Sequence, residues 1–320
     1  MTTRPTQPLT LVVGAGGLVG RHLVTAHGRA RHEVRVAAVP WGDEGESISA
    51  LLLALDDFSQ ARQGRPWSVA WCAGAGVVAT AEDALAAEVR VFDRVMGALA
   101  ASVGPDEDGV VFLASSAGGV YAGATGAPFD ERTDAVPLVP YGRAKLAMED
   151  TVQRVASETG VRAVIGRLAN VYGPGQTLGK PQGLLSQLCL ADATGRPLPL
   201  YVSMDTIRDY LYVGDAATMI VRCLELVRGE PRGAVVTKVL SSGRPVTVGY
   251  LVSEARRVFH RPLRTIAVGG AGTGQVLDLR LASRVWPDVD ALASTPLAAG
   301  LSRTAADVRA RVVSGGPLDP

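Results

Sequence analysis

The chain has few of the residues that build metal centres and disulfide frameworks. Its 320 residues include only three cysteines and four histidines, and no two cysteines have the short spacing of a metal-binding pair. Cys72 lies in an apolar strand-like run and Cys223 in a helical segment, and both are far from Cys189. We therefore expect buried structural thiols and no metal site.

An excess of one charge sign and long hydrophobic runs are also missing. The 32 basic and 31 acidic residues leave a net charge of +1, which argues against a nucleic-acid or membrane-surface partner. The longest aliphatic run, Ala50–Leu55, is far too short to cross a bilayer. The first eight residues are polar, unlike a signal peptide, so we expect a cytoplasmic protein.

Apolar strand-like runs alternate with amphipathic helical segments over the first half of the chain. The strand-like runs are 9–13, 32–39, 67–73, 109–116 and 161–168, and the helical segments are 21–27, 47–60, 81–101 and 141–159. Strands that alternate with helices at this spacing predict an α/β fold with a Rossmann-like, doubly wound parallel sheet.

The pattern changes after Tyr172, where loops and shorter elements take over. We therefore expect a smaller C-terminal substrate-binding lobe beside the sheet. In this division, residues 1–172 and 206–230 form the dinucleotide-binding domain, and residues 173–205 and 231–320 form the lobe.

The first strand-like run leads into the glycine turn Gly14-Ala-Gly-Gly-Leu-Val-Gly20 and then into a helical segment. Glycines let the backbone approach a pyrophosphate, and a helix N-terminus offers free N–H groups and a positive dipole end. The predicted cofactor-binding residues of this turn are therefore Gly14, Gly16, Gly17, Leu18, Val19 and Gly20. Ligands of such sheets bind beyond the carboxyl ends of the strands. The same cleft should be lined by residues 73–76, Ser115, Ser116 and residues 168–172, with Ala73, Gly74 and Leu168 as further cofactor contacts.

Tyr141 and Lys145 are four residues apart at the start of a helical segment, so both side chains project from one helix face. A lysine ammonium beside a phenol favours the phenolate. Such a tyrosine can exchange a proton with a sugar hydroxyl or carbonyl oxygen, and the lysine can hold cofactor ribose hydroxyls. We interpret the pair as catalytic; a chance pairing on a helix surface is the alternative.

Four further motifs accompany the glycine turn: Ser115-Ser-Ala-Gly-Gly-Val-Tyr121, Pro140-Tyr-Gly-Arg-Ala-Lys145, Arg167-Leu-Ala-Asn-Val-Tyr-Gly-Pro174 and Arg208-Asp-Tyr-Leu-Tyr-Val213. With them, nearly the whole chain resembles the extended short-chain dehydrogenase/reductase family, in its nucleotide-sugar epimerase, dehydratase and reductase branch. The resemblance implies an NAD- or NADP-dependent enzyme that acts on a nucleotide sugar.

The same resemblance implies a role for each matching residue. Tyr141 is the acid–base group, and Lys145 is its charge partner and the ribose contact. Asn170 contacts the substrate phosphate or an amide, with a turn-capping amide as the alternative. Arg208 contacts the pyrophosphate, a role that suits its planar fork; the alternative is a salt bridge to Asp209 or Asp205.

The chain departs from the family pattern at the substrate hydroxyl residue. Members carry Ser or Thr four residues before the tyrosine that matches Tyr121, and this chain has Ala117 there. We expect Ser116, one residue earlier, to serve in its place as a catalytic and substrate-binding residue, with Ser115 as a further substrate contact. The alternatives are that Tyr141 and a water hold the substrate oxygen, and that the serines only cap the strand end.

Two glycines stand where the related 4,6-dehydratases have an Asp-Glu pair, namely Gly118 and Gly119. Elimination of water by that route is therefore not expected. Farther along, members have an arginine about eight residues before an aspartate like Asp278, whereas this chain has the glycine-rich stretch 269–274. Arg264 and Arg280 do not fit that spacing.

The end of the second strand-like run leaves the cofactor undecided between NAD and NADP. An acidic residue normally holds the adenosine ribose there, but this chain has Ala38 and no basic residue suited to a 2′-phosphate. Asp43 and Glu44 follow and either fold back or remain solvated. Thin adenosine contacts suit an enzyme that exchanges its cofactor.

Three functions remain open at this point. The favoured one is a 4-ketoreductase of a nucleotide-linked 4-keto-(6-deoxy)sugar, followed by a nucleotide-sugar 4-epimerase and by a non-catalytic nucleotide-sensing protein. We also expect a homodimer, because segments 84–101 and 141–159 match the helices through which members dimerise and carry apolar stripes.

Overall fold

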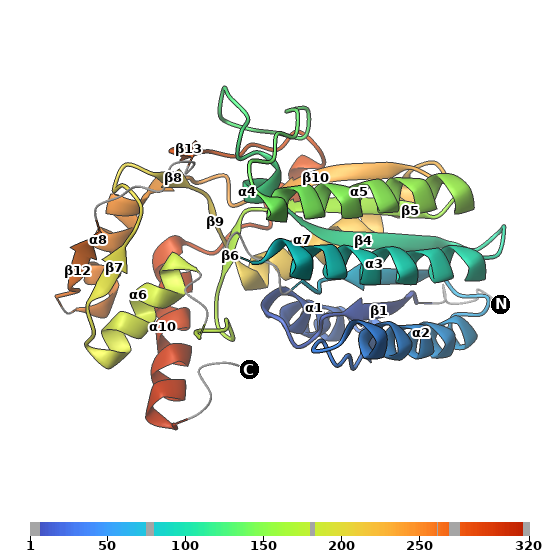
Figure 1. Cartoon of the computed structure of the whole chain (residues 1–320), viewed down its shortest axis with the longest axis horizontal. Coiled ribbons are helices and arrows are strands. Elements are labelled where there is room, and N and C mark those ends of the chain that lie inside the picture. The colour runs from blue at the N-terminus through green and yellow to red at the C-terminus, as the bar shows by residue number, and fades with distance from the viewer. Residues whose placement is uncertain (1–6, 75–79, 180–182, 261, 269–275, 316–320) are drawn as a thin grey trace.

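The computed structural model describes residues 7–74, 80–179, 183–260, 262–268 and 276–315. Its centre is a parallel sheet of six strands in the order β10-β5-β4-β3-β1-β2 (Figure 1). The strands are β1 (Leu9–Val13), β2 (Glu33–Ala37), β3 (Trp67–Trp71), β4 (Gly109–Ser116), β5 (Arg162–Leu168) and β10 (Val235–Leu240). The doubly wound α/β fold expected from the sequence is confirmed.

The strand order reverses at β1, which lies between β2 and β3. β1 and β3 are buried along their whole length, because helices cover both faces of the sheet. A crevice opens outside the carboxyl ends of the strands at such a reversal, and ligands of open α/β sheets bind there. β2 is an edge strand, because in the described sheet it pairs with β1 alone.

Helices pack on both faces of the sheet in two hydrophobic cores. One face carries α2 (Glu44–Ala61), α3 (Glu82–Ser102) and α5 (Pro140–Thr159), and the other carries α1 (Leu18–Arg29), α7 (Val213–Leu226) and the short α9 (Pro287–Asp290). Alternate residues of β1 supply the two cores: Leu9, Leu11 and Val13 face the first and Val12 faces the second. None of the described helices has the length and apolar character that a membrane span requires.

A lobe with its own hydrophobic core lies beyond the carboxyl ends of the strands (Figure 1). It contains α6 (Leu184–Thr194), β7 (Leu198–Leu200), α8 (Val248–Phe259), β12 (Thr265–Ala267) and α10 (Leu297–Val313). The connecting elements are α4 (Ala117–Val120), β6 (Asn170–Tyr172), β8 (Ile207–Arg208), β9 (Tyr210–Tyr212), the 3-10 turn Val227–Gly229, β11 (Val246–Thr247) and β13 (Asp278–Leu279).

One predicted boundary is wrong. The sequence assigned residues 231–320 to the lobe, but β10 pairs with β5 along its whole length and forms the other edge of the central sheet. The pairing buries Lys238, Val239 and Leu240. The buried half of this strand is only three residues long and begins with a lysine, which is why its periodicity gave no clear strand signal.

Candidate active site

The glycine turn brings β1 against β3 at the strand reversal. A Cβ on Gly14 would lie 2.5 Å from the Ala73 amide nitrogen, and one on Gly20 would lie 2.2 Å from the Gly14 carbonyl oxygen. Neither position can accept a side chain without moving backbone. Gly16 meets nothing within 4 Å, so its backbone faces open space. Gly17 then begins α1, whose first turn, Leu18 to Gly20, faces the same crevice with N–H groups suited to a pyrophosphate.

A cavity of about 290 Å³, which we name the tyrosine cavity, brings together most of the predicted cleft residues. Its lining comes from the ends of four strands and from α1 and α5: Val19, Cys72, Ala73, Gly74, Ala114, Ser115, Ser116, Tyr141, Lys145, Leu168, Ala169 and Val171. The Lys145 ammonium lies 5.7 Å from the Tyr141 ring centroid. The two predicted catalytic side chains therefore share one site. Of the predicted cleft residues, 75 and 76 lie outside the described residues.

Ser116 lines this cavity and also caps α4. Its hydroxyl oxygen accepts a hydrogen bond from the Gly119 N–H at 3.1 Å. The O–H itself is still able to donate, so capping and a bond to a substrate oxygen are compatible. Gly119 supports Tyr141 directly, because a Cβ there would lie 3.0 Å from the tyrosine Cε1. Ala117, in contrast, is fully buried and offers no hydroxyl.

Ser115 points its hydroxyl into the core. It is 3% exposed and donates to the Glu149 carboxylate at 2.5 Å. Glu149 also accepts two hydrogen bonds from Arg167, at 3.1 and 2.7 Å, and Arg167 donates to the Tyr121 hydroxyl at 2.9 Å. Successive residues of a strand face opposite sides, so the Ser115 hydroxyl is engaged in this network while Ser116 turns the other way. Ser115 nevertheless lines the tyrosine cavity, and the substrate contact predicted for it remains a prediction.

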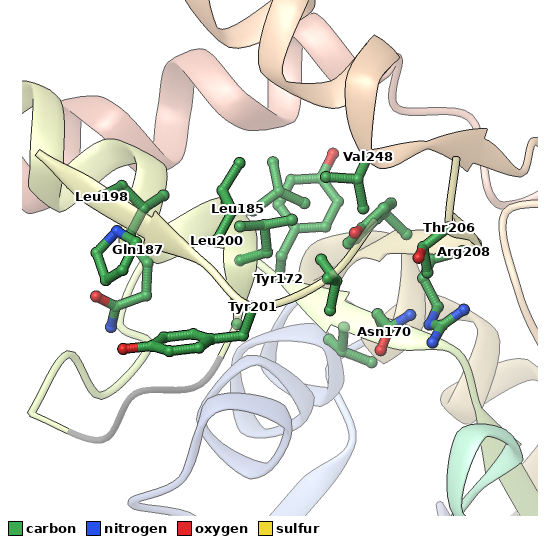
Figure 2. Close-up of a pocket in the computed structure, with 16 residues that line it drawn as sticks. Asn170, Tyr172, Leu185, Gln187, Leu198, Leu200, Tyr201, Thr206, Arg208 and Val248 are labelled. Carbon is green, nitrogen blue, oxygen red and sulfur yellow. The ribbon is translucent and has the colours of Figure 1, made fainter. Parts of the chain in front are cut away.

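A second cavity, of about 410 Å³, is lined by α6, β7 and α8 of the lobe and by the connecting strands β6, β8 and β9, and we name it the lobe cavity (Figure 2). Arg208 and Asn170 lie at one end of it, and Leu185, Leu198 and Leu200 line the rest. Its remaining lining residues are Val171, Tyr172, Gly183, Leu184, Gln187, Pro199, Tyr201, Val202, Thr206, Tyr210 and Val248. One charged end and an apolar body suit an amphipathic ligand with a phosphate group.

No described carboxylate lies within 4 Å of the Arg208 guanidinium. Burial lowers the pKa of this guanidinium. It donates to the Ile207 carbonyl at 2.8 Å. Asp209, a suggested salt-bridge partner, instead accepts from the N–H and hydroxyl of Ser242. Asn170 donates to the Asp209 carbonyl at 3.2 Å, as a turn-capping amide would, while lining the cavity. Arg208 is therefore available to a ligand.

A third cavity, of about 270 Å³, lies at the end of β2, and we name it the tryptophan cavity. It is lined by Trp41, Gly42, Asp43, Glu44, Ser47, Trp71, Ala73, Gly74, Ala84, Ala87, Glu88 and Val91. Trp41 meets Trp71 edge to face, and Asp43 caps α2 by accepting from the Glu46 N–H at 2.9 Å. A flat aromatic wall beside carboxylates suits an adenosine with a free ribose diol.

Neighbouring cavities share lining residues. Ala73 and Gly74 line both the tryptophan and the tyrosine cavity, and Val171 lines both the tyrosine and the lobe cavity. A dinucleotide that crosses the glycine turn would extend through the first two. A ligand in the lobe cavity would then meet it next to Tyr141. The chain's residues thus fit a nicotinamide cofactor and a second, phosphorylated ligand.

A family model for the NAD-dependent epimerase/dehydratase family matches residues 10–239. The chain belongs to this family. It is 31% identical to UDP-glucose 4-epimerase of Azospirillum brasilense over 257 residues, which cover 69% of this chain and 70% of that one. The family's enzymes act on sugar nucleotides as NAD-dependent epimerases, dehydratases and reductases.

Other similarities are shorter or concern the fold. The chain is 30% identical to dTDP-4-dehydro-6-deoxyglucose reductase of Escherichia coli over 115 residues, or 36% of each chain. Several such curated relatives are matched over a third or less of their length. The solved UDP-glucose 4-epimerase of Thermotoga maritima superposes with a TM-score of 0.76 at 20% identity, over 95% of this chain and 99% of that one.

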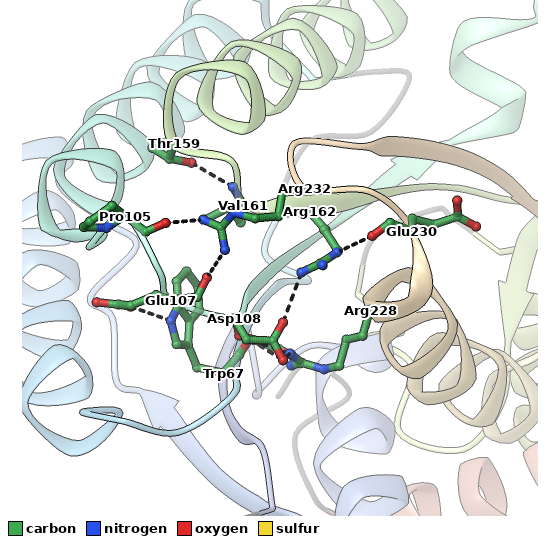
Figure 3. Close-up of polar contacts among 11 residues, drawn as sticks. Trp67, Pro105, Glu107, Asp108, Thr159, Val161, Arg162, Arg228, Glu230 and Arg232 are labelled. Carbon is green, nitrogen blue, oxygen red and sulfur yellow. Dashed lines mark hydrogen bonds and ion pairs between the residues drawn. The ribbon is translucent and has the colours of Figure 1, made fainter.

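At the opposite end of the sheet, where β3, β4 and β5 begin, arginines bind the loop before β4 (Figure 3). Arg228 donates to the Trp67 and Asp108 carbonyls, and its charge pairs with the Asp108 carboxylate at 3.0 Å. Arg162 pairs with the same carboxylate at 3.2 Å, and Arg232 donates to the Pro105 and Glu107 carbonyls. These contacts hold the loop before β4 in place and so stabilise the fold at this end of the sheet.

The thiols take no part in the cavities' polar chemistry. Burial raises the pKa of Cys72, Cys189 and Cys223 to about 12, so all three remain uncharged. The described residues contain no group of three or more His, Cys, Asp or Glu side chains placed to hold a metal ion. The C-terminal stretch 269–274 lies outside the described residues, and Arg280 pairs with Asp278 at 2.8 Å.

Sequence reasoning missed one charged residue of the site, Glu88. Its carboxylate lies 3.1 Å from the Lys145 ammonium. A signal was present, because Glu88 stands on the apolar stripe of α3 that otherwise consists of Leu85, Phe92, Val95 and Leu99. A carboxylate at a core-facing helix position indicates a buried partner.

Proposed function

We propose that the protein is a 4-ketoreductase of a nucleotide-linked 4-keto-(6-deoxy)sugar. The observation that carries the proposal is the set of neighbouring cavities, in which Tyr141 lines the cavity between the tryptophan cavity and the lobe cavity that contains the Arg208 guanidinium. The nucleotide pyrophosphate would bind Arg208, and the sugar would lie toward Val171 and Tyr141.

The chain's own residues perform the proton chemistry. Reduced cofactor, when bound, supplies the hydride for the carbonyl carbon. Tyr141 donates its phenolic proton to the carbonyl oxygen, so that the C4 ketone becomes an alcohol, and the phenolate then regains a proton from solvent. The Lys145 ammonium stabilises that phenolate. Ser116 donates a hydrogen bond to the same oxygen and orients it.

The test is to mix purified protein with nucleotide-linked 4-keto sugars and reduced cofactor, and to follow nicotinamide absorbance and the sugar product. Tyr141→Phe should lower kcat by about 10²–10⁴-fold. The fold should survive, because the described residues form no hydrogen bond with the hydroxyl while the ring packs on Gly119. Tyr250→Phe, at an exposed tyrosine of α8, is the matched control. Equal activity of Tyr141→Phe and wild type would refute the proposal.

A 4-epimerase is the second candidate. The long similarity to the Azospirillum brasilense epimerase favours it, and the same tyrosine and lysine would serve. An epimerase regenerates its cofactor in each cycle, so the purified protein should carry near-stoichiometric NAD. A reductase consumes one reduced cofactor for each product and should purify largely empty. Release and chromatography of bound nucleotide therefore separate the two candidates.

We further propose that the cofactor is NAD rather than NADP. Asp43, Glu44 and Glu88 line the tryptophan cavity, and its described lining contains no Lys or Arg. Arg90 lies nearby but donates two hydrogen bonds to the Glu44 carboxylate, at 2.9 and 2.7 Å. A 2′-phosphate would meet these carboxylates, so NADPH should bind at least about tenfold more weakly than NADH. Equal affinities, measured by titration, would contradict this.

The homodimer also remains a proposal. The apolar stripes of α3 and α5 that suggested it pack within the chain, against the sheet and each other. Their outer faces carry charged pairs, including Arg154 with Asp93 and Arg143 with Glu82. A dimer through these helices would be held by polar contacts and should weaken in high salt, which light scattering at two ionic strengths measures.

A further inference from the structure

The Lys145 ammonium forms a buried ion pair with Glu88 across two helices. The distance between the ammonium and the carboxylate is 3.1 Å, and the two side chains are only 5% and 15% exposed. Both groups pack over Gly74, where an added Cβ would lie 3.1 Å from the carboxylate and 3.2 Å from the ammonium. The pair is therefore fixed by α3, α5 and the turn after β3.

The pair also lies on the border between two cavities. Glu88 lines the tryptophan cavity, Lys145 lines the tyrosine cavity, and Gly74 lines both. A cofactor that runs from one cavity to the other must pass this border. The charge of the pair, and not that of the lysine alone, is what such a cofactor meets.

We propose that Glu88 is a positioning residue that neutralises the lysine charge and so sets the relative affinity for oxidised and reduced cofactor. The proposal rests on the proposed cofactor function. An unpaired ammonium repels the positive nicotinamide ring of NAD⁺ and does not repel the neutral ring of NADH. The Glu88 carboxylate cancels that repulsion and keeps the ammonium on the cavity wall.

The two forms of the cofactor are therefore the measurement. Titration of NAD⁺ and of NADH into wild type and Glu88→Gln gives the ratio of the two dissociation constants without any sugar substrate. We expect Glu88→Gln to bind NAD⁺ about tenfold more weakly relative to NADH. Glu88→Asp keeps the charge and should restore the wild-type ratio.

Glu82→Gln is the matched control, because Glu82 lies on the same helix, is 74% exposed and pairs with Arg143 outside the cavities. Its ratio should equal that of wild type. If the ion pair is purely structural, Glu88→Gln should weaken the binding of NAD⁺ and of NADH alike. An unchanged ratio of the two dissociation constants would overturn this inference and leave the proposed function standing. Wild-type protein that bound neither form would contradict the proposed function as well.

Discussion

Replacing Glu149 by glutamine tests whether the buried network beneath Tyr141 is structural. The carboxylate is 2% exposed and accepts three hydrogen bonds, two from Arg167 and one from Ser115. Burial lowers the pKa of Arg167, but the hydrogen bonds and charge of Glu149 outweigh burial and raise it, so the arginine stays charged. The variant thus leaves a buried cation without its counter-charge.

Removing one partner of a buried ion pair costs about 3–5 kcal/mol of unfolding free energy. We expect about 3 kcal/mol for Glu149→Gln, since the amide oxygen keeps one acceptor for the arginine. Urea unfolding followed by fluorescence measures this as a lower midpoint at an unchanged slope. An unchanged midpoint would refute the reasoning.

Ser115→Ala completes the experiment, because it separates a core hydroxyl from a substrate contact. It removes one hydrogen bond to Glu149 and should cost about 1 kcal/mol. The KM for the sugar nucleotide should stay within about twofold, because this hydroxyl faces the core. A large rise in KM with unchanged stability would restore the role predicted from the sequence.

Three further changes test other parts of the structure. Burial, reinforced by the neighbouring histidine, lowers the pKa of His27 from 6.5 to about 4. As the pH falls, the unfolded chain therefore protonates the His27 imidazole before the folded chain does. Up to about 3 kcal/mol of stability should be lost between pH 6.5 and pH 4. Denaturation at several pH values should show a smaller loss for His27→Leu. Asp108→Asn removes ion pairs with two arginines, including Arg228, at the amino ends of the strands. It should lower stability by about 1–2 kcal/mol with unchanged kcat, and a lower kcat at full stability would contradict that assignment. Gly119→Ala would press on the Tyr141 ring, whereas Gly118→Ala meets nothing within 4 Å. Only the first should lower kcat, by about tenfold, and equal rates for the two variants would count against the packing argument.

The sequence predicted the elements around the site better than the lobe boundary. β1 and β4 lie where the apolar runs placed them, and the glycine turn, Tyr141 and Lys145 meet in one cleft as expected. These elements have strong local signals, namely continuous apolar runs and helical spacing. β10 carries a weak one, and its place depends on pairing with a strand some seventy residues earlier. Local periodicity does not contain that pairing.

The sequence also could not predict the direction of the side chains at the end of β4. The sequence places Ser115 and Ser116 together, and only the register of β4 decides which hydroxyl meets Glu149 and which meets the cavity. A shift of one residue would exchange the two. The sequence therefore supported two candidate hydroxyls, and the structure shows that the Ser115 hydroxyl bonds Glu149 whereas that of Ser116 caps α4.

The residues that match the family and those that depart from it differ in how they are constrained. Gly14 and Gly20 are limited by backbone atoms 2.5 and 2.2 Å from any added Cβ, so no other residue fits without moving the chain. Ala117 is fully buried, and the Glu88 carboxylate pairs with Lys145 at 3.1 Å. The glycine turn is thus constrained by backbone atoms, whereas Glu88 and Ser116 act through the charge and hydrogen bonds of their side chains. The specific reaction of this chain should therefore depend on Glu88 and Ser116 more than on the glycine turn.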